Sequence, residues 1–398
     1  MPNARPLPRA VMYAYPWDLE GPGAEATIDR LARLGVDGVQ LAATYHVADF
    51  LMPRHPSARV RAGELGSLQF SPCDAPEVEW PFDPPVAPDA DRPGRLARLV
   101  DALHDRDLDA TAWIPFLYNH ELVRARPELA VRNAWKDRNA AQLCPSNPAA
   151  RSWARALATA VPRAAPFDAV HVESLSFLAY DYGFLNLKAA VVPDVRASLL
   201  LGLCFCAHCR ARASEAGCDV DALADAVRSD VDAHLNALPD GAGPSREDLR
   251  FEDPGTDEAV RAFLHERERS ATSLQLEILD LLGAAGLRLG SSSVEAPDPR
   301  VTGLAVEQVV PRLGELRIDA TPGLGAPDPV ALAARLRAHA RPDVPLYATV
   351  QLSAFASESA FRAALDRLRA DGIDRFRFYA LGMASERQLG WIGRACGS

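Results

Sequence analysis

Short β-rich runs alternate with amphipathic helical stretches along the whole chain of 398 residues. The sequence predicts strands at 10–16, 37–43, 109–115, 168–174, 286–292, 315–320, 345–351 and 374–380. It predicts helices at 23–34, 92–106, 148–162, 256–283, 301–312, 328–340, 357–371 and 385–394. Strands that are separated by helices pair in parallel through right-handed crossovers. Eight of each in strict order predict a closed (β/α)8 TIM barrel rather than an open sheet.

The chain is longer than such a barrel needs. A minimal barrel has about 250 residues, and the surplus is concentrated in two strand-to-helix loops. One is the Pro-rich stretch 47–91 after strand 2, and the other is 177–255 after strand 4, which contains most of the cysteines. Because such loops build the active-site face of this fold, we expect both to be insertions within a single barrel domain over residues 1–398.

The composition of the chain argues against nucleic acid and membranes as its binding partners. The hydrophobic content is 48%, which excludes a disordered chain, and the net charge is −10. An acidic chain lacks the clustered basic charge that a nucleic-acid partner requires. No apolar run reaches the length of a signal peptide or the roughly 18 residues of a membrane span. We therefore expect a soluble, cytoplasmic protein without a membrane partner, and the sequence leaves open whether it forms a homo-oligomer.

The alternation of side chains along a strand predicts which residues face the barrel interior. His171 and Glu173 face inward from strand 168–174, and Arg317 and Asp319 face inward from strand 315–320. Other inward residues are Arg288, Gly290, Ser292, Tyr347, Thr349, Gln351, Arg377 and Tyr379. A buried arginine needs a counter-charge, so the inward arginines either form an internal salt-bridge layer or bind a ligand.

Two of the inward carboxylates end their strands at the expected C-terminal mouth. Catalytic residues of TIM barrels gather there, and two facing carboxylates are the minimal equipment for cleaving a glycosidic bond. We therefore predict Glu173 and Asp319 as the catalytic pair. The alternative for Glu173 is an ion pair with an inward arginine, and the alternative for Asp319 is the capping of a turn at Thr321-Pro322-Gly323.

Aromatic and polar side chains accumulate at the same strand ends. Flat rings flanked by hydrogen-bonding groups suit a sugar, whose C–H faces stack while its hydroxyls bond. Any one of these aromatic residues taken alone is more often ordinary packing. Their accumulation predicts a small-molecule carbohydrate substrate bound by Tyr15, Trp17, Tyr45, His46, Trp113, Asn119, Tyr182, Gln351 and Tyr379.

Three cysteines form a C-x-C-x-x-C run at Cys204, Cys206 and Cys209. Three thiolates at this spacing can converge on one tetrahedral zinc ion, with a fourth ligand from Cys144, His208 or Cys218. With four protein ligands the zinc would be structural and would hold the long loop after strand 4 in place. The alternative is a set of unligated thiols.

The order of these motifs resembles the glycoside hydrolase family 42 β-galactosidases and related barrel hydrolases. The shared pattern is Cys144-Pro145-Ser146-Asn147-Pro148, a helix, a strand ending in Glu173, and the cysteine run, over roughly residues 110–215. The resemblance implies that Glu173 is the acid/base and that Cys144, Cys204, Cys206 and Cys209 bind zinc. The chain differs from the family at Val172, where the family has Asn, and at Gln351, where it has its nucleophilic glutamate.

These observations predict a glycoside hydrolase-like enzyme that uses Glu173 with Asp319 as the second carboxylate. Two alternatives stay open. The loss of the strand-7 carboxylate favours a catalytically silent carbohydrate-binding barrel. The inward arginines favour an isomerase or lyase that holds the carboxylate or phosphate of a small polar metabolite.

Overall fold

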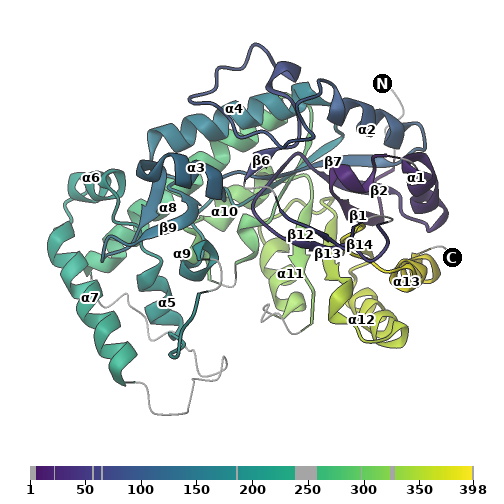
Figure 1. Cartoon of the computed structure of the whole chain (residues 1–398). Coiled ribbons are helices and arrows are strands. Elements are labelled where there is room, and N and C mark those ends of the chain that lie inside the picture. The colour runs from purple at the N-terminus through teal and green to yellow at the C-terminus, as the bar shows by residue number, and fades with distance from the viewer. Residues whose placement is uncertain are drawn as a thin grey trace.

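Eight parallel strands form a nearly closed barrel in the computed structural model (Figure 1). The structure describes residues 6–21, 23–55, 58–63, 66–184, 187–237, 258–296, 298–322 and 328–396. The barrel strands are β1 (Ala10–Ala14), β2 (Gly38–Ala42), β7 (Asp109–Pro115), β10 (Ala169–Glu173), β11 (Arg288–Ser291), β12 (Leu316–Asp319), β13 (Leu346–Gln351) and β14 (Arg375–Tyr379). Each lies within a predicted strand, so the predicted TIM barrel is confirmed.

The strand order runs β11-β10-β7-β2-β1-β14-β13-β12, so neighbours in sequence are neighbours in space. β1 pairs in parallel with both β2 and β14, which brings the first and last strands together. At the remaining seam, the amides of Gly314 and Glu315 donate to the carbonyl of Leu289 at 2.8 and 3.1 Å. These bonds join the β11 side to the start of β12 and bring the barrel close to closure.

Helices follow most of the strands and cover the outside of the barrel (Figure 1). They are α1 (Ala24–Arg33), α2 (Arg95–His104), α4 (Pro148–Ala164), α8 (Glu258–Ala284), α11 (Pro329–Arg337), α12 (Glu358–Ala370) and α13 (Glu386–Cys396). The predicted start signals are present. Asn147 and Asp328 accept hydrogen bonds from the amides two residues ahead, and each precedes a proline at the first helical position.

The predicted helix 301–312 is wrong. The chain forms α9 (Pro299–Thr302), α10 (Val306–Val309) and a 3-10 turn, η7 (Val310–Arg312). Gly303 has a left-handed φ of 66° and ends α9 as its C-terminal cap. Gly303 therefore ends the helix within a sequence whose apolar pattern alone predicts a continuous one.

The loop after β2 contains two short pairs of antiparallel strands. β3 (Thr44–Tyr45) pairs with β6 (Ser67–Leu68), and β4 (Phe50–Leu51) pairs with β5 (Val60–Arg61), both antiparallel. Between β7 and α4 lie α3 (His120–Ala125) and the antiparallel pair β8 (Ala130–Arg132) and β9 (Arg138–Leu143). Further 3-10 turns are η1 (Pro16–Asp18), η2 (Pro72–Asp74), η3 (Pro127–Leu129), η6 (Ser293–Glu295) and η8 (Leu352–Ala354).

The loop after β10 contains η4 (Tyr180–Gly183), α5 (Val195–Leu201), α6 (Ala207–Glu215) and α7 (Val220–Ala237). In Figure 1, α5 and α7 lie on the lower side of the molecule, beside the barrel. The end of the predicted insertion, 238–255, lies outside the described residues. The assignment of both loops to one barrel domain stays a prediction.

A layer of ion pairs lies inside the barrel toward the N-terminal ends of its strands, opposite the mouth, and is called the lower layer below. Arg288 contacts Asp109 and Glu315 at 3.0 Å, and Arg377 pairs with Glu315 and donates to Gln40. Burial opposes the ionised form of Glu315, but the two arginines hold the pKa of its carboxyl below the ordinary value. Of the two predicted roles for the inward arginines, Arg288 and Arg377 therefore have the first, an internal salt-bridge layer. None of the described helices is long and apolar enough to cross a membrane.

Candidate functional site

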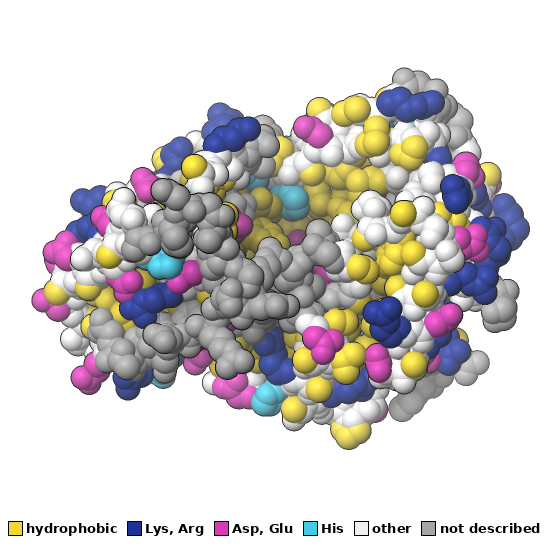
Figure 2. Space-filling view, turned by 90° about the horizontal axis from the view of Figure 1, so that it is seen from below, with side chains coloured by type: hydrophobic (Ala, Val, Ile, Leu, Met, Phe, Trp, Pro, Cys, Tyr) yellow, Lys and Arg dark blue, Asp and Glu magenta, His cyan; other side chains and the backbone are white. Residues whose placement is uncertain are grey.

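A cavity of about 480 Å³ lies at the C-terminal ends of the barrel strands. Figure 2 shows the molecule from the side on which the loop after β10 lies, and this face is hollowed, with hydrophobic side chains gathered in the hollow. The cavity is lined by Tyr13, Tyr45, Trp113, Glu173, Ser174, Ser176, Leu178, Ala179, Tyr182, Ser292, Ser293, Glu295, Ala296, Val301, Thr302, Arg317, Asp319, Thr349, Gln351 and Tyr379. It is thus the mouth of the barrel, which is where ligands bind in this fold.

Glu173 is the last residue of β10 and is half-buried in the cavity wall. Its Oε2 accepts a hydrogen bond of 2.6 Å from the indole Nε1 of Trp113 on the neighbouring strand β7. Because a rigid indole donor fixes the carboxylate in one orientation, Glu173 is presented to the cavity in a defined position. None of the described arginines lies within ion-pair distance of Glu173, so it is not the partner of an inward arginine.

Asp319 is the last residue of β12 and lines the same cavity. Its Oδ1 accepts a hydrogen bond of 2.9 Å from the amide of Thr321. Asp319 therefore both caps the turn that follows it and lines the mouth. Gly323 of the predicted turn lies outside the described residues.

A third carboxylate, Glu295, belongs to this site and was missed by the sequence analysis. It is in η6, beyond the end of β11, and its side chain is 10% exposed. Arg317 contacts its two oxygens at 2.6 and 3.2 Å and also donates to the hydroxyl of Tyr13. Burial, together with the nearby charges of Asp319 and Glu173, raises the pKa of Glu295 to about 7, against the lowering effect of Arg317.

The position of Glu295 could not be read from strand alternation, because it lies on a turn. The available signal was Arg317, whose inward position required a carboxylate near the mouth. Among the described residues that line the cavity, Arg317 is the only cation, and it faces three carboxylates. The mouth therefore carries excess negative charge.

The predicted substrate-binding residues divide into two groups. Five of them line the cavity, namely Tyr45, Trp113, Tyr182, Gln351 and Tyr379. The structure brings these together with Glu173 and Asp319 from seven different strands or turns. Their role in binding stays a prediction.

The other four lie outside the cavity lining. Tyr15 is buried at 1% exposure, and Trp17 stacks on it with ring centroids 4.7 Å apart. His46 stacks on Tyr45, and its Nδ1 bonds with the carbonyl of Val47. Asn119 caps α3 by accepting from the amide of Leu122. Local packing and capping occupy these side chains, and the strand-end positions alone did not reveal this.

Three tyrosine hydroxyls are hydrogen-bonded to one another in the aromatic wall of the cavity. The hydroxyl of Tyr379 lies 2.7 Å from that of Tyr15 and 3.1 Å from that of Tyr45. Burial raises the pKa of all three hydroxyls, so each keeps its proton at neutral pH. The wall that Tyr45 and Tyr379 present to the cavity is thus neutral and can donate hydrogen bonds.

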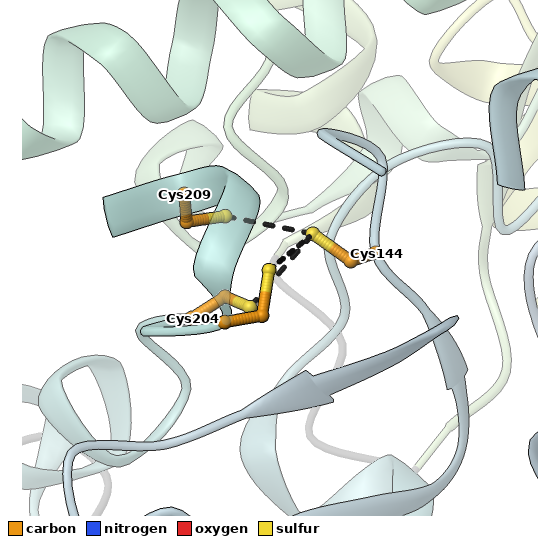
Figure 3. A group of neighbouring side chains, drawn as sticks. Cys144, Cys204 and Cys209 are labelled. Carbon is orange, nitrogen blue, oxygen red and sulfur yellow. Dashed lines mark hydrogen bonds between the residues drawn. The ribbon is translucent and has the colours of Figure 1, made fainter. Parts of the chain in front are cut away.

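The four predicted cysteines form a buried cluster (Figure 3). The sulfur of Cys144 lies 3.8, 3.6 and 3.5 Å from those of Cys204, Cys206 and Cys209. Cys144 follows β9, whereas the other three lie before and within the first turn of α6. Of the three candidates for the fourth position, Cys144 is the one that joins the cluster.

The geometry of the cluster fits a metal ion. All four sulfurs lie within 4.8 Å of one another, and none of the four cysteines forms a disulfide. A tetrahedral centre with metal–sulfur bonds of about 2.3 Å places its sulfurs roughly 3.8 Å apart. The backbone amide of Arg132 also donates a hydrogen bond to the sulfur of Cys204 at 3.5 Å.

Comparison with solved structures shows to which proteins the fold is similar. The glycoside hydrolase domain of PgaB (BpsB) from Bordetella bronchiseptica matches with a TM-score of 0.56 and 14% identity, over 98% of each chain. The α-L-fucosidase isoenzyme 2 from Paenibacillus thiaminolyticus has a TM-score of 0.59 and 12% identity, over 98% of this chain and 49% of that chain. A catalytic mutant of a GH42 β-galactosidase from G. stearothermophilus has a TM-score of 0.52 and 11% identity, over 98% and 56%.

The chain spans about half the length of the fucosidase and of the β-galactosidase that it matches. No family model and no curated protein sequence matches it. At these identities the likeness establishes the fold, a TIM barrel of the kind found in glycoside hydrolases. It does not single out family 42, because hydrolases of other substrates are as similar.

Proposed function

We propose that the protein cleaves a glycosidic bond at the mouth of its barrel, with Glu173 as the acid/base and Asp319 as the second carboxylate. The observation that carries this proposal is that both carboxylates end barrel strands and line one aromatic-walled cavity. A cavity of about 480 Å³ lies within the range of small-molecule sites. The neutral tyrosines and Trp113 supply rings for stacking and donors for sugar hydroxyls.

In the proposed reaction, protonated Glu173 gives its proton to the oxygen of the leaving group. Asp319 then either attacks the anomeric carbon or takes a proton from an attacking water. The hydrogen bond from Trp113 holds Glu173 in place for this transfer. Glu295 is the competing candidate for the second carboxylate, but its two oxygens are engaged by Arg317.

The contacts of the arginines favour this function over an isomerase or lyase for acidic metabolites. Such an enzyme needs a cation that is free to bind a carboxylate or phosphate. Arg288 and Arg377 are paired in the lower layer, and Arg317 is paired with Glu295. An acidic metabolite would also meet the excess negative charge of the mouth.

The test is a panel of aryl glycosides and acidic metabolites, assayed with the wild-type protein and with Glu173→Gln. We expect turnover of at least one glycoside and a loss of roughly 10³-fold in kcat for the variant, because general-acid catalysis typically contributes 10²- to 10⁴-fold. The control is Glu128→Gln, which changes an exposed side chain in the loop after β7 and should keep full activity. Sugar binding without turnover would support the silent carbohydrate-binding barrel, and turnover of acidic metabolites alone would contradict the proposal.

We also propose that the cysteine cluster binds one structural zinc ion. Four thiolates are the ligand set of closed structural zinc sites, which leave no open position for catalysis. The ion would tie the loop that carries α6 to the end of β9. Elemental analysis should find about one zinc per chain, reduced in Cys206→Ser and unchanged in the control Cys73→Ser, whose thiol is exposed and outside the cluster. This assignment would be refuted if the wild-type protein contained no metal and the thiols of all four cluster cysteines could be titrated.

A further inference from the structure

Arg267 on α8 is a buried cation at the junction of several loops. Its side chain is 4% exposed, and its Nη1 donates to the carbonyls of Arg300 and Val301 at 3.0 and 2.9 Å. Its Nη2 donates to the carbonyl of Gly202 at 3.3 Å, two residues before the cysteine run. The guanidinium also lies over the ring of Phe177, 4.0 Å from the centroid. One side chain thus joins the loop after β10 to the segment that contains α9.

The backbone is adapted to the guanidinium at one position. Gly303 has a φ of +66°, and a Cβ added there would lie 3.2 Å from both Cγ and Nη1 of Arg267 and 3.3 Å from the ring of Phe177. Glycine is the residue that tolerates this backbone conformation and this closeness together. The turn at Gly303 therefore both ends α9 and admits the guanidinium.

Arg267 borders the cysteine cluster, because Arg267, Cys204 and Cys209 line one small cavity. No carboxylate among the described residues lies within ion-pair distance of this guanidinium, and Glu266, which lines the same cavity, pairs with Arg269. Four neutral thiols beside the guanidinium would leave its buried charge without compensation. Four thiolates on a divalent ion would carry a net charge of about −2, which more than offsets the single positive charge of the guanidinium.

The other side of Arg267 reaches the substrate cavity. Val301, whose carbonyl it binds, lines the cavity, as does Thr302. The carbonyl of Thr302 accepts from the amide of Phe177 at 3.0 Å, and Ser176 before it is also a lining residue. The guanidinium therefore contacts the backbone of the lining residue Val301. It also contacts the ring of Phe177, which follows the lining residue Ser176.

We infer that Arg267 is a positioning residue that couples the thiolate–metal centre to the wall of the substrate cavity at 299–303. The metal then shapes substrate binding as well as the fold of the loop. This inference rests on the proposed zinc site and, for its kinetic consequence, on the proposed function.

The test compares Arg267→Lys and Arg267→Met with a matched control, Arg269→Gln. Arg269 lies on the same helix, is 60% exposed and pairs with Glu266. Lysine keeps the charge and removes the fork that binds two carbonyls at once, whereas methionine removes both. A further arm depletes the wild-type protein of metal with a chelator, at a temperature at which circular dichroism shows it folded. Each sample is examined by hydrogen exchange of the amides of Phe177 and Gly303, by zinc content and by steady-state kinetics.

We expect exchange at Phe177 and Gly303 to rise by about tenfold or more in both variants and in the metal-depleted protein, since one charge-assisted bond corresponds to at least that factor. KM should rise on the order of tenfold while kcat changes less than about twofold. Arg267→Lys should keep its zinc. The control should match the wild type in every measurement.

If the amides of Phe177 and Gly303 exchange at the wild-type rate in the folded variants, Arg267 has no positioning role. If their exchange is unchanged after metal removal, the coupling to the metal is refuted. If Arg267→Met does not fold, the lysine variant and the depleted protein decide both questions. The exchange and zinc measurements do not depend on turnover. A protein without glycosidase activity would therefore contradict the proposed function while leaving this inference open to confirmation or refutation by exchange.

Discussion

The barrel interior contains two groups of arginines and carboxylates that differ in their charge balance. In the lower layer, Arg288 and Arg377 share Glu315, and Asp109 completes the group, so two cations meet two anions. At the mouth, Arg317 is bound by Glu295, while Glu173 and Asp319 lack a cationic partner among the described residues. The balanced group is buried and closed, whereas the unbalanced one opens into a cavity.

The difference separates a structural from a chemical use of the same residue types. A buried ion pair that is fully matched fixes the packing of strands and has no group left to react. Carboxylates without a cation, placed at strand ends beside a cavity, can exchange protons with a ligand. The excess of negative charge at the mouth is thus the best local indicator of where chemistry occurs in this barrel.

Among the variants of the two groups, substitution of Asp319 at the mouth should lower the activity most. Asp319→Asn keeps the hydrogen bond with Thr321, because the amide oxygen can accept it, but removes the charge. We expect kcat/KM to fall by roughly 10³-fold on any glycoside that the wild-type protein turns over, with stability nearly unchanged. Glu295→Gln should lose much less activity. Steady-state kinetics of both variants decides, and the reverse ranking would assign the second carboxylate to Glu295.

The sequence was sufficient to predict the barrel, because hydrophobic periodicity and strict alternation of elements reflect the architecture directly. It also placed Glu173 and Asp319 at the mouth, since the parity of side chains along a strand fixes which ones face inward. The spacing of the cysteines, together with the resemblance, indicated the four members of the cluster. Each of these features depends on local sequence or on the regularity of a strand.

Features that depend on turns and on distant contacts were not predictable in the same way. Glu295 lies on a 3-10 turn, and its partner Arg317 is 22 residues further along the chain. Asn119 ends its strand region as expected but turns away to cap α3. The sequence also does not tell a paired inward arginine from one that binds ligand, because its counter-charge comes from another strand or loop.

The next largest effect tests the lower layer. Glu315→Gln leaves Arg288 and Arg377 without their shared carboxylate, and removing one partner of a buried ion pair typically costs about 3–5 kcal/mol. We expect urea denaturation to show a loss of unfolding free energy of that size. The activity per folded molecule should change little. The control, Glu386→Gln, removes an exposed carboxylate paired with Arg30 and should cost less than about 1 kcal/mol.

A loss of activity without a loss of stability in Glu315→Gln would contradict a purely structural role of the lower layer. The native pKa of Glu315 is below the ordinary value, so its ionised form stabilises the fold above that value. This contribution is lost as the pH falls through the folded pKa. The difference in stability between wild type and variant should therefore shrink in acid.

The smallest effect concerns the pH dependence of the mouth. The pKa of Glu295 is raised from 4.5 to about 7, so the folded protein binds this proton more tightly than the unfolded chain does. Between these two pH values the unfolding free energy should fall as the pH rises, by up to about 1 kcal/mol per pH unit from this one group. Glu295→Gln has no such proton, and its stability should depend less steeply on pH between 5 and 7.

The absolute stability of Glu295→Gln will also fall, because Arg317 loses its partner, and so the slope rather than the intercept carries the test. Asp18→Asn provides the matched control. Burial raises the pKa of Asp18 from 3.8 to about 6, so this variant should flatten the curve in a lower window, between about pH 4 and 6. Equal slopes above pH 6 in wild type and Glu295→Gln would show that Arg317 keeps Glu295 ionised at neutral pH. The mouth would then contain a matched pair like those of the lower layer, with Glu173 and Asp319 alone as its excess charge.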